Sequence, residues 1–394
     1  MILNLLNRRT SLFDKDFRGF LAEMQEKAIK SSFLVVGGAG SIGSAVVKTL
    51  VDLGAEKIQI VDISENNLVE LIRDIRSSKE LISTEIETFA LDCGSQEFQK
   101  FFDDQVAIDY LLNFSALKHV RSERDTYTLK RLIDVNIINP LSLLDLAEKK
   151  GCKKYFCVST DKATNPVNMM GASKLLMENF IFSQSTKLSV STARFANVAF
   201  SDGSLLFGFE HRFNKKQPLA IPTDIRRFFI TPEEAAQLCV LACLVAKDKQ
   251  ILFPKVGEKF YDISLVDIAK RYLDLKGLTP MPFDNEREAK RAVVNALSEG
   301  KWPCFYFKSD TTGEKNFEEF YSENESVNLN LFSDLGVVNY VKNDFSVLYE
   351  DFIDRFNSFK LRKCWDKSEL INLFKEILPN FNHEEKHKNL DQKM

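Results

Sequence analysis

Residues 32–43 read SFLVVGGAGSIG, and this stretch predicts the first unit of the fold. A short continuous apolar run that ends in glycines is typical of a strand buried on both faces of a sheet. Apolar residues then recur at helical spacing through Leu53, and the next apolar run, KIQIVDIS (57–64), reads as a second strand. Strand, glycine turn, helix and strand in this order predict the start of a parallel α/β sheet.

The glycines in this stretch have the spacing G-x-x-G-x-x-G. Without Cβ atoms the backbone can turn sharply, approach a pyrophosphate and pack the helix against the strand. The first turn of the helix adds backbone N–H groups and the positive end of its dipole. The predicted phosphate-binding residues are Gly37, Gly40, Ser41, Ile42 and Gly43.

The second strand ends in an acidic residue, Asp62, 19 residues after Gly43. An acid at this place can accept hydrogen bonds from both hydroxyls of an adenosine ribose and would repel a 2′-phosphate. NAD is therefore the expected cofactor, and NADP stays open because Arg73 or Arg76 could fold back from the next helix. Asp92 follows the third strand, where it would either meet the adenine amino group or only form a turn.

The alternation of strands and helices continues to about residue 200. Further strands are expected in IETFALD, YLLNFSA, KKYFCVSTD and LSVSTARFANV. The expected fold is a Rossmann-like, doubly wound parallel sheet with a smaller C-terminal substrate-binding lobe. We expect a leading helical segment at 1–30, the dinucleotide-binding domain at 31–200 and the lobe at 201–394, with elements of the two interleaving.

Two parts of the C-terminal half look irregular in sequence. Residues 277–315 are rich in charge and show no clear periodicity, so we expect an irregular segment with an insertion near 280–310. The chain closes in HEEKHKNLDQKM (383–394), which predicts a solvated tail whose two histidines are not ligands.

Composition narrows the function. The 53 Lys and Arg against 56 Asp and Glu give a net charge of −3, which disfavours a nucleic-acid or anionic-membrane binder but leaves room for a local basic pocket that takes one phosphorylated ligand. Seven scattered cysteines without a CxxC pair predict no metal site, and Cys239 and Cys243 read as core thiols of one helix. With no apolar run near 18 residues, we expect a soluble, cytoplasmic protein.

Five stretches resemble one enzyme family. They are VVGGAGSIGS (35–44), NFSALKHV (113–120), STDKATNPVNMMGASK (159–174), ARFANVAFSDGSLLFGF (193–209) and DIRRFFIT (224–231). In this order they resemble the extended short-chain dehydrogenases/reductases, and among these the nucleotide-sugar 4,6-dehydratases acting on UDP-N-acetylglucosamine in bacterial surface-glycan and polysaccharide biosynthesis. The resemblance resumes weakly at TTGEKNFEEFYSENE (311–325). Members with membrane spans carry them ahead of the catalytic part, so this chain is expected to act in solution.

The resemblance implies a closed redox cycle on the sugar. A hydride leaves carbon 4, which makes a ketone and acidifies the hydrogen on carbon 5. That hydrogen is removed while the hydroxyl on carbon 6 leaves as water, and the hydride returns to carbon 6. The product is a 4-keto-6-deoxy sugar nucleotide.

The resemblance also implies roles in STDKATNPVNMMGASK. Asp161 is the expected general acid for the leaving hydroxyl, Lys162 the base at carbon 5, and Thr160 the group that orients the 4-hydroxyl. Lys174 should hold the nicotinamide ribose. Met170 stands where most relatives have a catalytic Tyr. A subgroup of the family carries Met at this place, in a Met-xxx-Lys pattern, and is active, which implies a packing role for Met170. We expect burial and the nearby Lys174 to help Lys162 lose its proton.

Outside this segment the resemblance implies further contacts. Ser115 and Ala116 should lie beside the cofactor, and Asn136 should brace the active-site backbone, whereas His119 is not expected to be catalytic. The expected substrate-binding residues are Lys118, Asn197, Ser204, Arg227 and its neighbour Arg226. The expected partner is a UDP-sugar, with a GDP-sugar open, and the family implies a homo-oligomer.

Two other functions fit the same fold. A nucleotide-sugar 4-epimerase would re-reduce the ketone from the opposite face, but it needs no elimination acid and base and typically keeps the Tyr. A non-catalytic NAD-binding protein would have no chemical need for Thr160, Asp161, Lys162 and Lys174 together.

Overall fold

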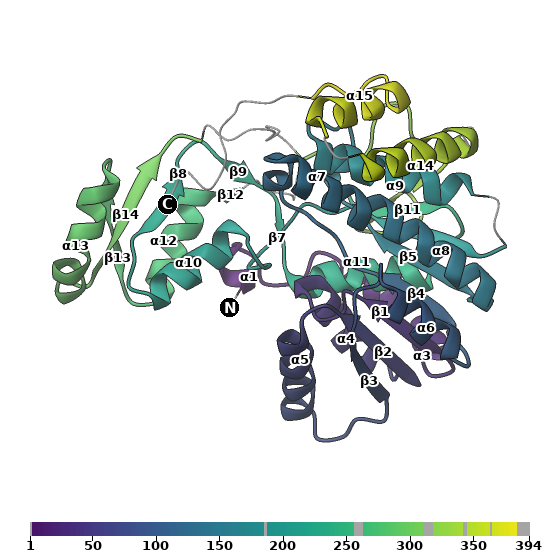
Figure 1. The fold of residues 1–394 in the computed structure, drawn as a ribbon. Helices are drawn as coiled ribbons and strands as arrows, with labels where there is room; N and C mark the ends of the chain where they lie inside the picture. Colours follow the sequence, from purple (N-terminus) through teal and green to yellow (C-terminus); the bar gives the residue numbers. More distant parts are fainter. Residues whose placement is uncertain are drawn as a thin grey trace.

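The computed structural model describes residues 2–184, 187–255, 263–309, 318–341, 345–362 and 365–383. Its main sheet has nine strands in the order β15-β16-β11-β6-β5-β4-β1-β2-β3 (Figure 1). The parallel strands are β1 (Ser32–Val36), β2 (Lys57–Asp62), β3 (Glu85–Ala90), β4 (Tyr110–Asn113), β5 (Lys154–Val158), β6 (Ser189–Ala193) and β11 (Gln250–Pro254). β16 (Leu335–Asn339) and β15 (Ser326–Asn328) add antiparallel pairings at one edge. The predicted doubly wound α/β fold is confirmed.

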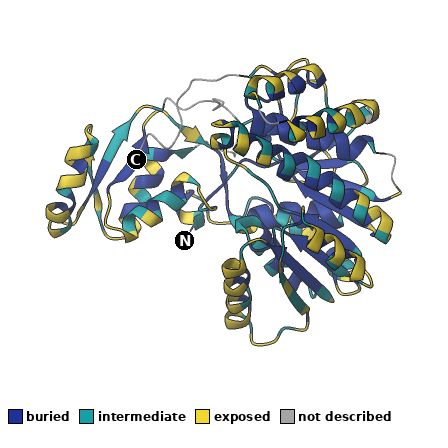
Figure 2. Cartoon of the chain, in the orientation of Figure 1, coloured by how far each residue is buried: buried dark blue, intermediate teal, exposed yellow. Residues whose placement is uncertain are grey.

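Helices cover both faces of this sheet (Figure 1). One face carries α4 (Ser41–Asp52), α5 (Glu65–Ser78) and α11 (Pro232–Leu244). The other face carries α6 (Gln96–Asp104), α8 (Asn139–Lys150) and α9 (Met169–Ser183), with α7 (Thr126–Ile133), α14 (Phe345–Leu361) and α15 (Lys367–Ile377) outside them. The central strands are buried, whereas the edge strands β3 and β15 are partly exposed, and the outermost helices expose one face, as expected for a sheet covered on both sides (Figure 2).

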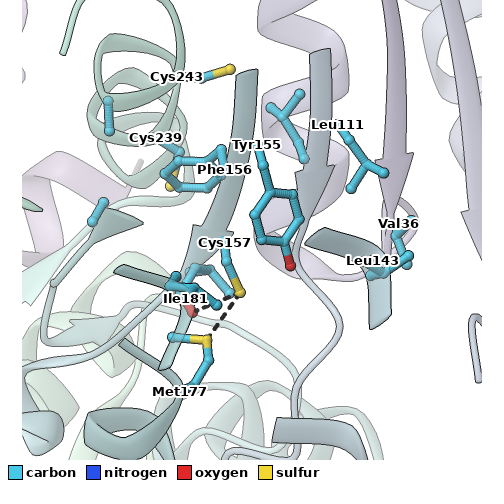
Figure 3. Close-up of a cluster of buried hydrophobic side chains, with 14 of the residues drawn as sticks. Val36, Leu111, Leu143, Tyr155, Phe156, Cys157, Met177, Ile181, Cys239 and Cys243 are labelled. Carbon is cyan, nitrogen blue, oxygen red and sulfur yellow. Dashed lines mark hydrogen bonds between the residues drawn. The ribbon is translucent and has the colours of Figure 1, made fainter. Parts of the chain in front are cut away.

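The middle strand β5 shows how the core is built (Figure 3). Successive side chains of a strand point to opposite faces, so Phe156 lies near Cys239 of α11, and Cys157 meets Met177 of α9. Tyr155 is fully buried, and its hydroxyl donates to the carbonyl oxygen of Pro140 at 2.9 Å. The six described cysteines are all buried and unpaired, which confirms Cys239 and Cys243 as core thiols.

A second, smaller sheet forms the core of a separate lobe. It has the order β13-β14-β8 and is parallel throughout. Its strands are β8 (Leu219–Pro222), β13 (Thr279–Phe283) and β14 (Lys301–Phe307), and its helices are α10 (Leu205–Asn214), α12 (Leu265–Leu275) and α13 (Glu286–Ser298). The prediction that 277–315 is irregular was wrong for residues 279–307, which form a strand–helix–strand unit extending the sheet from β8.

Short strand pairs lie where the chain passes between the two lobes. β7 (Asn197–Val198) pairs with β10 (Phe229–Ile230), and β9 (Arg226–Arg227) pairs with β12 (Ile263–Ser264). The chain after residue 200 therefore contributes to both sheets, because β11, β15 and β16 return to the main one. Elements of the two lobes therefore interleave along the chain.

The leading segment also contacts both lobes. In α1 (Ile2–Leu5), Leu5 packs into the core of the smaller lobe, whereas α2 (Asp14–Gly19) and α3 (Leu21–Ala28) lie against α11 of the main domain. Arg8 forms two hydrogen bonds of 2.9 Å to the buried carboxylate of Glu234. Residues 2–28 thus contact both lobes. Among the described residues, no helix is long and apolar enough to cross a membrane.

Candidate functional site

Most of the predicted site residues follow the carboxyl ends of parallel strands. The glycine turn follows β1, Asp62 ends β2, and Asp92 follows β3. Ser115 and Ala116 follow β4, and the segment 160–162 follows β5. Because these ends share one edge of the sheet, the five loops lie together. The strand order reverses between β1 and β4, which is where ligands bind in sheets of this kind.

The glycine turn is packed too tightly for side chains at two positions. Gly37 has φ +71°, and a Cβ there would lie 2.6 Å from the amide nitrogen of Ser115. A Cβ on Gly43 would lie 2.2 Å from the carbonyl oxygen of Gly37. Gly40 has more room, with its nearest neighbour at 3.5 Å, and it is the N-cap residue of α4. The turn therefore offers bare backbone at the start of a helix, as a pyrophosphate requires.

Asp62 is tied into the glycine turn. Its Oδ2 accepts from the amide of Ala39 at 3.0 Å, and its Oδ1 accepts from the amide of Ser64 at 2.9 Å. Each carboxylate oxygen has a second acceptor direction left for a ribose hydroxyl. The hydroxyl of Ser41 accepts from the amide of Asp202 at 2.9 Å, which links α4 to the loop before α10. This geometry fits an adenosine dinucleotide.

Asp92 forms a turn in the structure. Its Oδ1 accepts from the amide of Gly94 at 2.9 Å, and its Oδ2 pairs with Arg131 at 2.9 Å. Partial burial opposes ionisation, but Gly94 and Arg131 outweigh it and lower the pKa of Asp92. The turn interpretation of Asp92 is therefore supported, and a contact with adenine stays a prediction.

Asn136 braces the loop that follows β4. Its side chain accepts from the amide of Leu117 at 2.9 Å and donates to the carbonyl of the same residue at 3.0 Å. It also donates to the hydroxyl of Ser173 in α9 at 3.0 Å. Asn136 lies in a short π-helical turn, Asp134–Ile138, a feature that is frequent at functional sites. The predicted brace is present, and it joins the β4 loop to α9. Ser115 itself caps this loop by donating to Asn113.

Thr160, Asp161 and Lys162 share one set of hydrogen bonds. The hydroxyl of Thr160 donates to Asp161 Oδ1 at 2.8 Å, and Lys162 Nζ donates to the same oxygen at 3.2 Å. Asp161 is 5% exposed, whereas the Lys162 side chain is 36% exposed. The burial that we expected for Lys162 is therefore only partial. Within the described part of the chain, Asp161 Oδ2 takes no hydrogen bond and is left for a ligand.

Lys174 and Met170 lie on the buried helix α9. Lys174 Nζ donates to the carbonyl of Val158 at 3.1 Å, at the end of β5. Burial lowers the pKa of Lys174, although Cys157 and Glu178 oppose the shift. The Met170 residue is 3% exposed, in agreement with a packing role.

Two residues that sequence reasoning missed hold the start of α9. Glu123 is buried, and its Oε1 accepts from the amide of Met170 at 3.2 Å. Its Oε2 lies 2.9 Å from Nε2 of His383, and both side chains are less than a tenth exposed. The prediction of a solvated tail from residue 383 was therefore wrong for His383. Glu123 and His383 are 260 positions apart, so no local pattern could join them.

Replacing His383 with Ala should weaken the start of α9. Glu123 would keep a buried carboxylate with one donor fewer, at a cost of about 1–3 kcal/mol. Urea unfolding should show that loss, whereas Asn382→Ala, at an exposed neighbour, should change the free energy of unfolding by less than about 0.5 kcal/mol. Equal stabilities of the two variants would contradict a role for the His383–Glu123 contact.

Gly171 is a third residue that was missed, although it stands inside the quoted motif. A Cβ at Gly171 would lie 2.3 Å from the backbone oxygen of Lys162. Only glycine allows α9 to lie this close to the turn that carries Thr160 and Asp161. A glycine inside a helical pattern was the signal available in the sequence.

Gly171→Ala should displace this turn although alanine favours helices. We expect a loss of about 1–3 kcal/mol in unfolding free energy from overpacking, together with loss of activity. Gly19→Ala is the matched control, since a Cβ at helical Gly19 meets nothing within 4 Å and should be neutral or stabilising. If both variants behave alike, α9 is not held by this close contact.

The predicted substrate-binding residues lie between the two lobes. Lys118 Nζ is 3.4 Å from the hydroxyl of Ser201, and burial lowers the pKa of Lys118 while Asp202 opposes the shift. His119 packs against Gly203, where a Cβ would lie 2.8 Å from Nε2 of the ring. A packing role for His119 fits this contact.

Ser204, Asn197 and Arg227 have partners within the protein. Ser204 caps α10 by accepting from the amide of Phe207. Asn197 donates to Glu318 at 2.9 Å, and Nε of Arg227 lies 3.8 Å from the same carboxylate oxygen. Arg226 is exposed, whereas Arg227 is partly buried. Glu318 was not singled out in the sequence, and it belongs to the segment where the resemblance resumes. Residues 311–317 of that segment lie outside the described residues.

No group of three or more His, Cys, Asp or Glu side chains in the described residues could hold a metal ion. The groups available at this edge are a glycine turn with bare backbone, the carboxylate of Asp62, the hydrogen-bonded set of Thr160, Asp161 and Lys162, and the buried Lys174.

Comparison with known proteins places the chain in a family. A model for the family described as "Polysaccharide biosynthesis protein" matches residues 33–339, and the chain belongs to this family. The uncharacterized membrane protein MJ1061 of Methanocaldococcus jannaschii is 31% identical over 317 residues, which cover 78% of this chain and 85% of that protein. The capsular polysaccharide biosynthesis protein CapD of Staphylococcus aureus is 24% identical, and the match covers 87% of this chain but 54% of CapD. A UDP-N-acetylglucosamine 4,6-dehydratase (inverting) of Campylobacter jejuni is 26% identical over 58% of this chain and 67% of that protein.

Solved structures share the fold. Pen from Bacillus thuringiensis superposes with a TM-score of 0.61 at 21% identity, covering 79% of this chain and 87% of Pen. UDP-glucose 4-epimerase of Thermotoga maritima, solved with UDP-glucose, gives 0.55 at 19% identity, covering 74% and 90%. The enzyme WbmF of Bordetella bronchiseptica, solved with NAD+ and UDP, gives 0.51 at 18% identity, covering 73% and 90%. These likenesses support the two-lobed Rossmann-like architecture.

Proposed function

We propose that the chain is an NAD-dependent enzyme that modifies a nucleotide sugar for polysaccharide or surface-glycan biosynthesis. The glycine turn and Asp62 support binding of NAD, and NADP is the less favoured cofactor because Asp62 would repel a 2′-phosphate. Family membership and the named relatives support a sugar nucleotide as the substrate. A UDP-sugar is the first choice and a GDP-sugar the second.

Within this class we propose a 4,6-dehydratase acting on UDP-N-acetylglucosamine or a related sugar nucleotide. The observation that carries this proposal is the shared hydrogen-bond set of Thr160, Asp161 and Lys162 at the end of β5. An elimination needs an acid and a base close together, and the Asp161–Lys162 contact of 3.2 Å supplies such a pair. A 4-epimerase would not need it.

The chemistry expected from NAD, when it is bound, is reversible acceptance of one hydride. Removing the 4-hydroxyl proton falls to the protein. Thr160 Oγ1 would accept that proton while its own proton passes to Asp161 along the 2.8 Å hydrogen bond. In this proposal Thr160 relays the proton of the sugar 4-hydroxyl to Asp161, a step for which the sequence did not identify a base.

This relay leaves Asp161 protonated and ready for the next step. Asp161 would give the proton to the hydroxyl on carbon 6 as it leaves as water, while Lys162, as the neutral amine, removes the hydrogen on carbon 5. Lys162 would later return a proton to carbon 5. Two protons are taken, from the 4-hydroxyl and carbon 5, and two are given back, so the side chains end as they began.

The remaining residues would bind and orient. Lys174 would contact the nicotinamide ribose, with Met170 packing beside it, and Arg227 would meet the diphosphate with its planar guanidinium. Lys118, Asn197 and Ser204 lie where the sugar and nucleoside would pass between the lobes, with Arg226 at the rim. A homo-oligomer belongs to this proposal, and light scattering that finds a monomer would count against it.

One experiment separates the functions. The protein is incubated with UDP- and GDP-N-acetylglucosamine in heavy water, and the sugars are followed by NMR. A 4-keto-6-deoxy product with deuterium at carbon 5 supports the dehydratase. A 4-epimer without deuterium at carbon 5 points to the epimerase. Unchanged sugars in the presence of bound NAD would point to a non-catalytic binding protein.

A further inference from the structure

A basic hollow lies on the smaller lobe, between the end of α10 and α13. Its volume is about 620 Å³, a size that admits a small organic ligand. His211, Arg212, Lys215 and Lys216 line it from the end of α10 and the turn beyond, and Lys290 and Val293 line it from α13. No carboxylate is among the lining residues, although the whole chain carries a net charge of −3. The hollow is therefore locally positive on a negative protein.

Among the residues that the structure describes, the cations at the end of α10 and in the turn beyond it have no acidic partners. Among the described residues, Arg212, Lys215 and Lys216 form no ion pair, and only Lys290 is balanced, by Glu286 on its own helix. Three uncompensated cations on one wall of a hollow produce a potential that attracts anions.

The Arg212 side chain is partly buried and lies against α10. Its NH1 donates to the carbonyl of Gly208 at 3.3 Å, and a Cβ on Gly208 would lie 2.7 Å from that nitrogen. Gly208 thus leaves the space in which the guanidinium lies against α10. Burial lowers the pKa of Arg212, and no carboxylate offsets this cost. An anion in the hollow would offset it.

The helix dipole alone does not explain this cluster. Cations near the C-terminus of α10 complement its dipole, which is a sufficient reason for His211 and Arg212. Lys290, however, is the fifth residue of α13 and lies beyond its first turn, so the helix dipole gives no reason for a cation there. The two helices bring their cations to one hollow.

The hollow is separate from the proposed catalytic site. Ser204 caps the N-terminus of α10, whereas the hollow lies at its C-terminus. The ten residues of α10 span roughly 15 Å at 1.5 Å per residue. A ligand in the hollow therefore does not lie at the end of α10 that faces Lys118 and the glycine turn.

We propose that this hollow binds a small ligand carrying phosphate groups, distinct from the substrate. The proposal does not depend on the reaction that the main site performs. Arg212 would engage two phosphate oxygens with its planar fork, and Lys215, Lys216 and Lys290 would surround the remaining charge. The phosphate can belong to a free phosphate ester or to a lipid headgroup, since both present the same oxygens.

Binding of two probes tests the proposal on the full chain. Inorganic pyrophosphate is titrated by calorimetry at low ionic strength, and vesicles of phosphatidylglycerol are compared with phosphatidylcholine by co-sedimentation. The double variant Lys215→Gln, Lys216→Gln should bind the responding probe at least about tenfold more weakly, which corresponds to about 1.4 kcal/mol. Pyrophosphate binding alone assigns a soluble ligand, and binding to the anionic vesicles alone assigns a headgroup.

Two controls isolate the hollow. Lys100→Gln with Lys270→Gln removes the same charge from exposed positions on α6 and α12, and it should bind like the unmodified chain. Arg227→Ala removes the cation proposed for the substrate diphosphate and should leave binding in the hollow intact. The proposal is overturned if neither probe binds, if both double variants lose binding equally, or if only Arg227→Ala loses it.

Discussion

Asp161→Asn should lower the rate of product formation by about 10²–10⁴-fold while leaving cofactor binding intact. Asparagine keeps the size of the side chain and can still accept the hydrogen bond from Thr160. It cannot carry a proton to the leaving hydroxyl, so water loss from carbon 6 would have no acid. The measurement is the rate at which the 4-keto-6-deoxy sugar forms, followed by NMR.

The cofactor provides the control for this variant. Asp161 follows β5, whereas the glycine turn and Asp62 belong to β1 and β2, so titration with NAD should give the same affinity before and after the change. A variant that binds NAD normally and makes product at an undiminished rate would remove Asp161 from the role of acid. Loss of both properties would instead indicate a damaged fold.

Arg194→Met should cause the largest loss of stability. Arg194 is 1% exposed and makes two hydrogen bonds to Glu178 on α9, at 2.9 and 2.6 Å. It makes two more to Glu325, at 3.0 and 2.8 Å, and one to the carbonyl of Phe320. Burial opposes its charge, but the two glutamates raise the pKa of Arg194, so it stays cationic.

Removing this cation would leave two carboxylates, one of them fully buried, without their partner. Breaking a buried ion pair in this way costs about 3–5 kcal/mol, which is a large share of the stability of a domain. Urea unfolding should show the loss. Arg362→Met is the matched control, because its pair with Glu369 is about half exposed on both sides and is worth less than about 1 kcal/mol. Similar effects in the two variants would contradict the importance of burial at Arg194.

The central part of the main sheet was predictable because its strands are local apolar runs. The stretches that periodicity selected contain β1, β2, β4 and β5. The spacing of the glycines predicted the turn between β1 and α4. Two strands of the smaller sheet were not predicted, because β13 contains Pro280 and Pro282 and β14 contains Pro303. Proline lacks an amide donor and argues against a strand, yet β13 is an edge strand, where this loss is tolerated.

The site was predictable only where its residues follow strands in sequence. Thr160, Asp161 and Lys162 are adjacent, so their shared hydrogen bonds follow from one turn. Glu318 and His383 reach the site from the far end of the chain, and their partners are set by tertiary packing. Periodicity and spacing describe neighbours in sequence, and they contain no information on which distant side chain will meet a buried carboxylate.

The covering of α9 has a consequence for synthesis of the protein. Of its 15 residues, 14 are buried, and Phe180 packs against Tyr349 and Phe352 of α14. A ribosome needs on the order of ten seconds to make the residues between α9 and α14. During that time α14 has not been made, so the apolar side of α9 that it covers in the folded protein stays exposed. A nascent chain halted before α14 should therefore engage chaperones through α9, and release should follow once α14 has emerged.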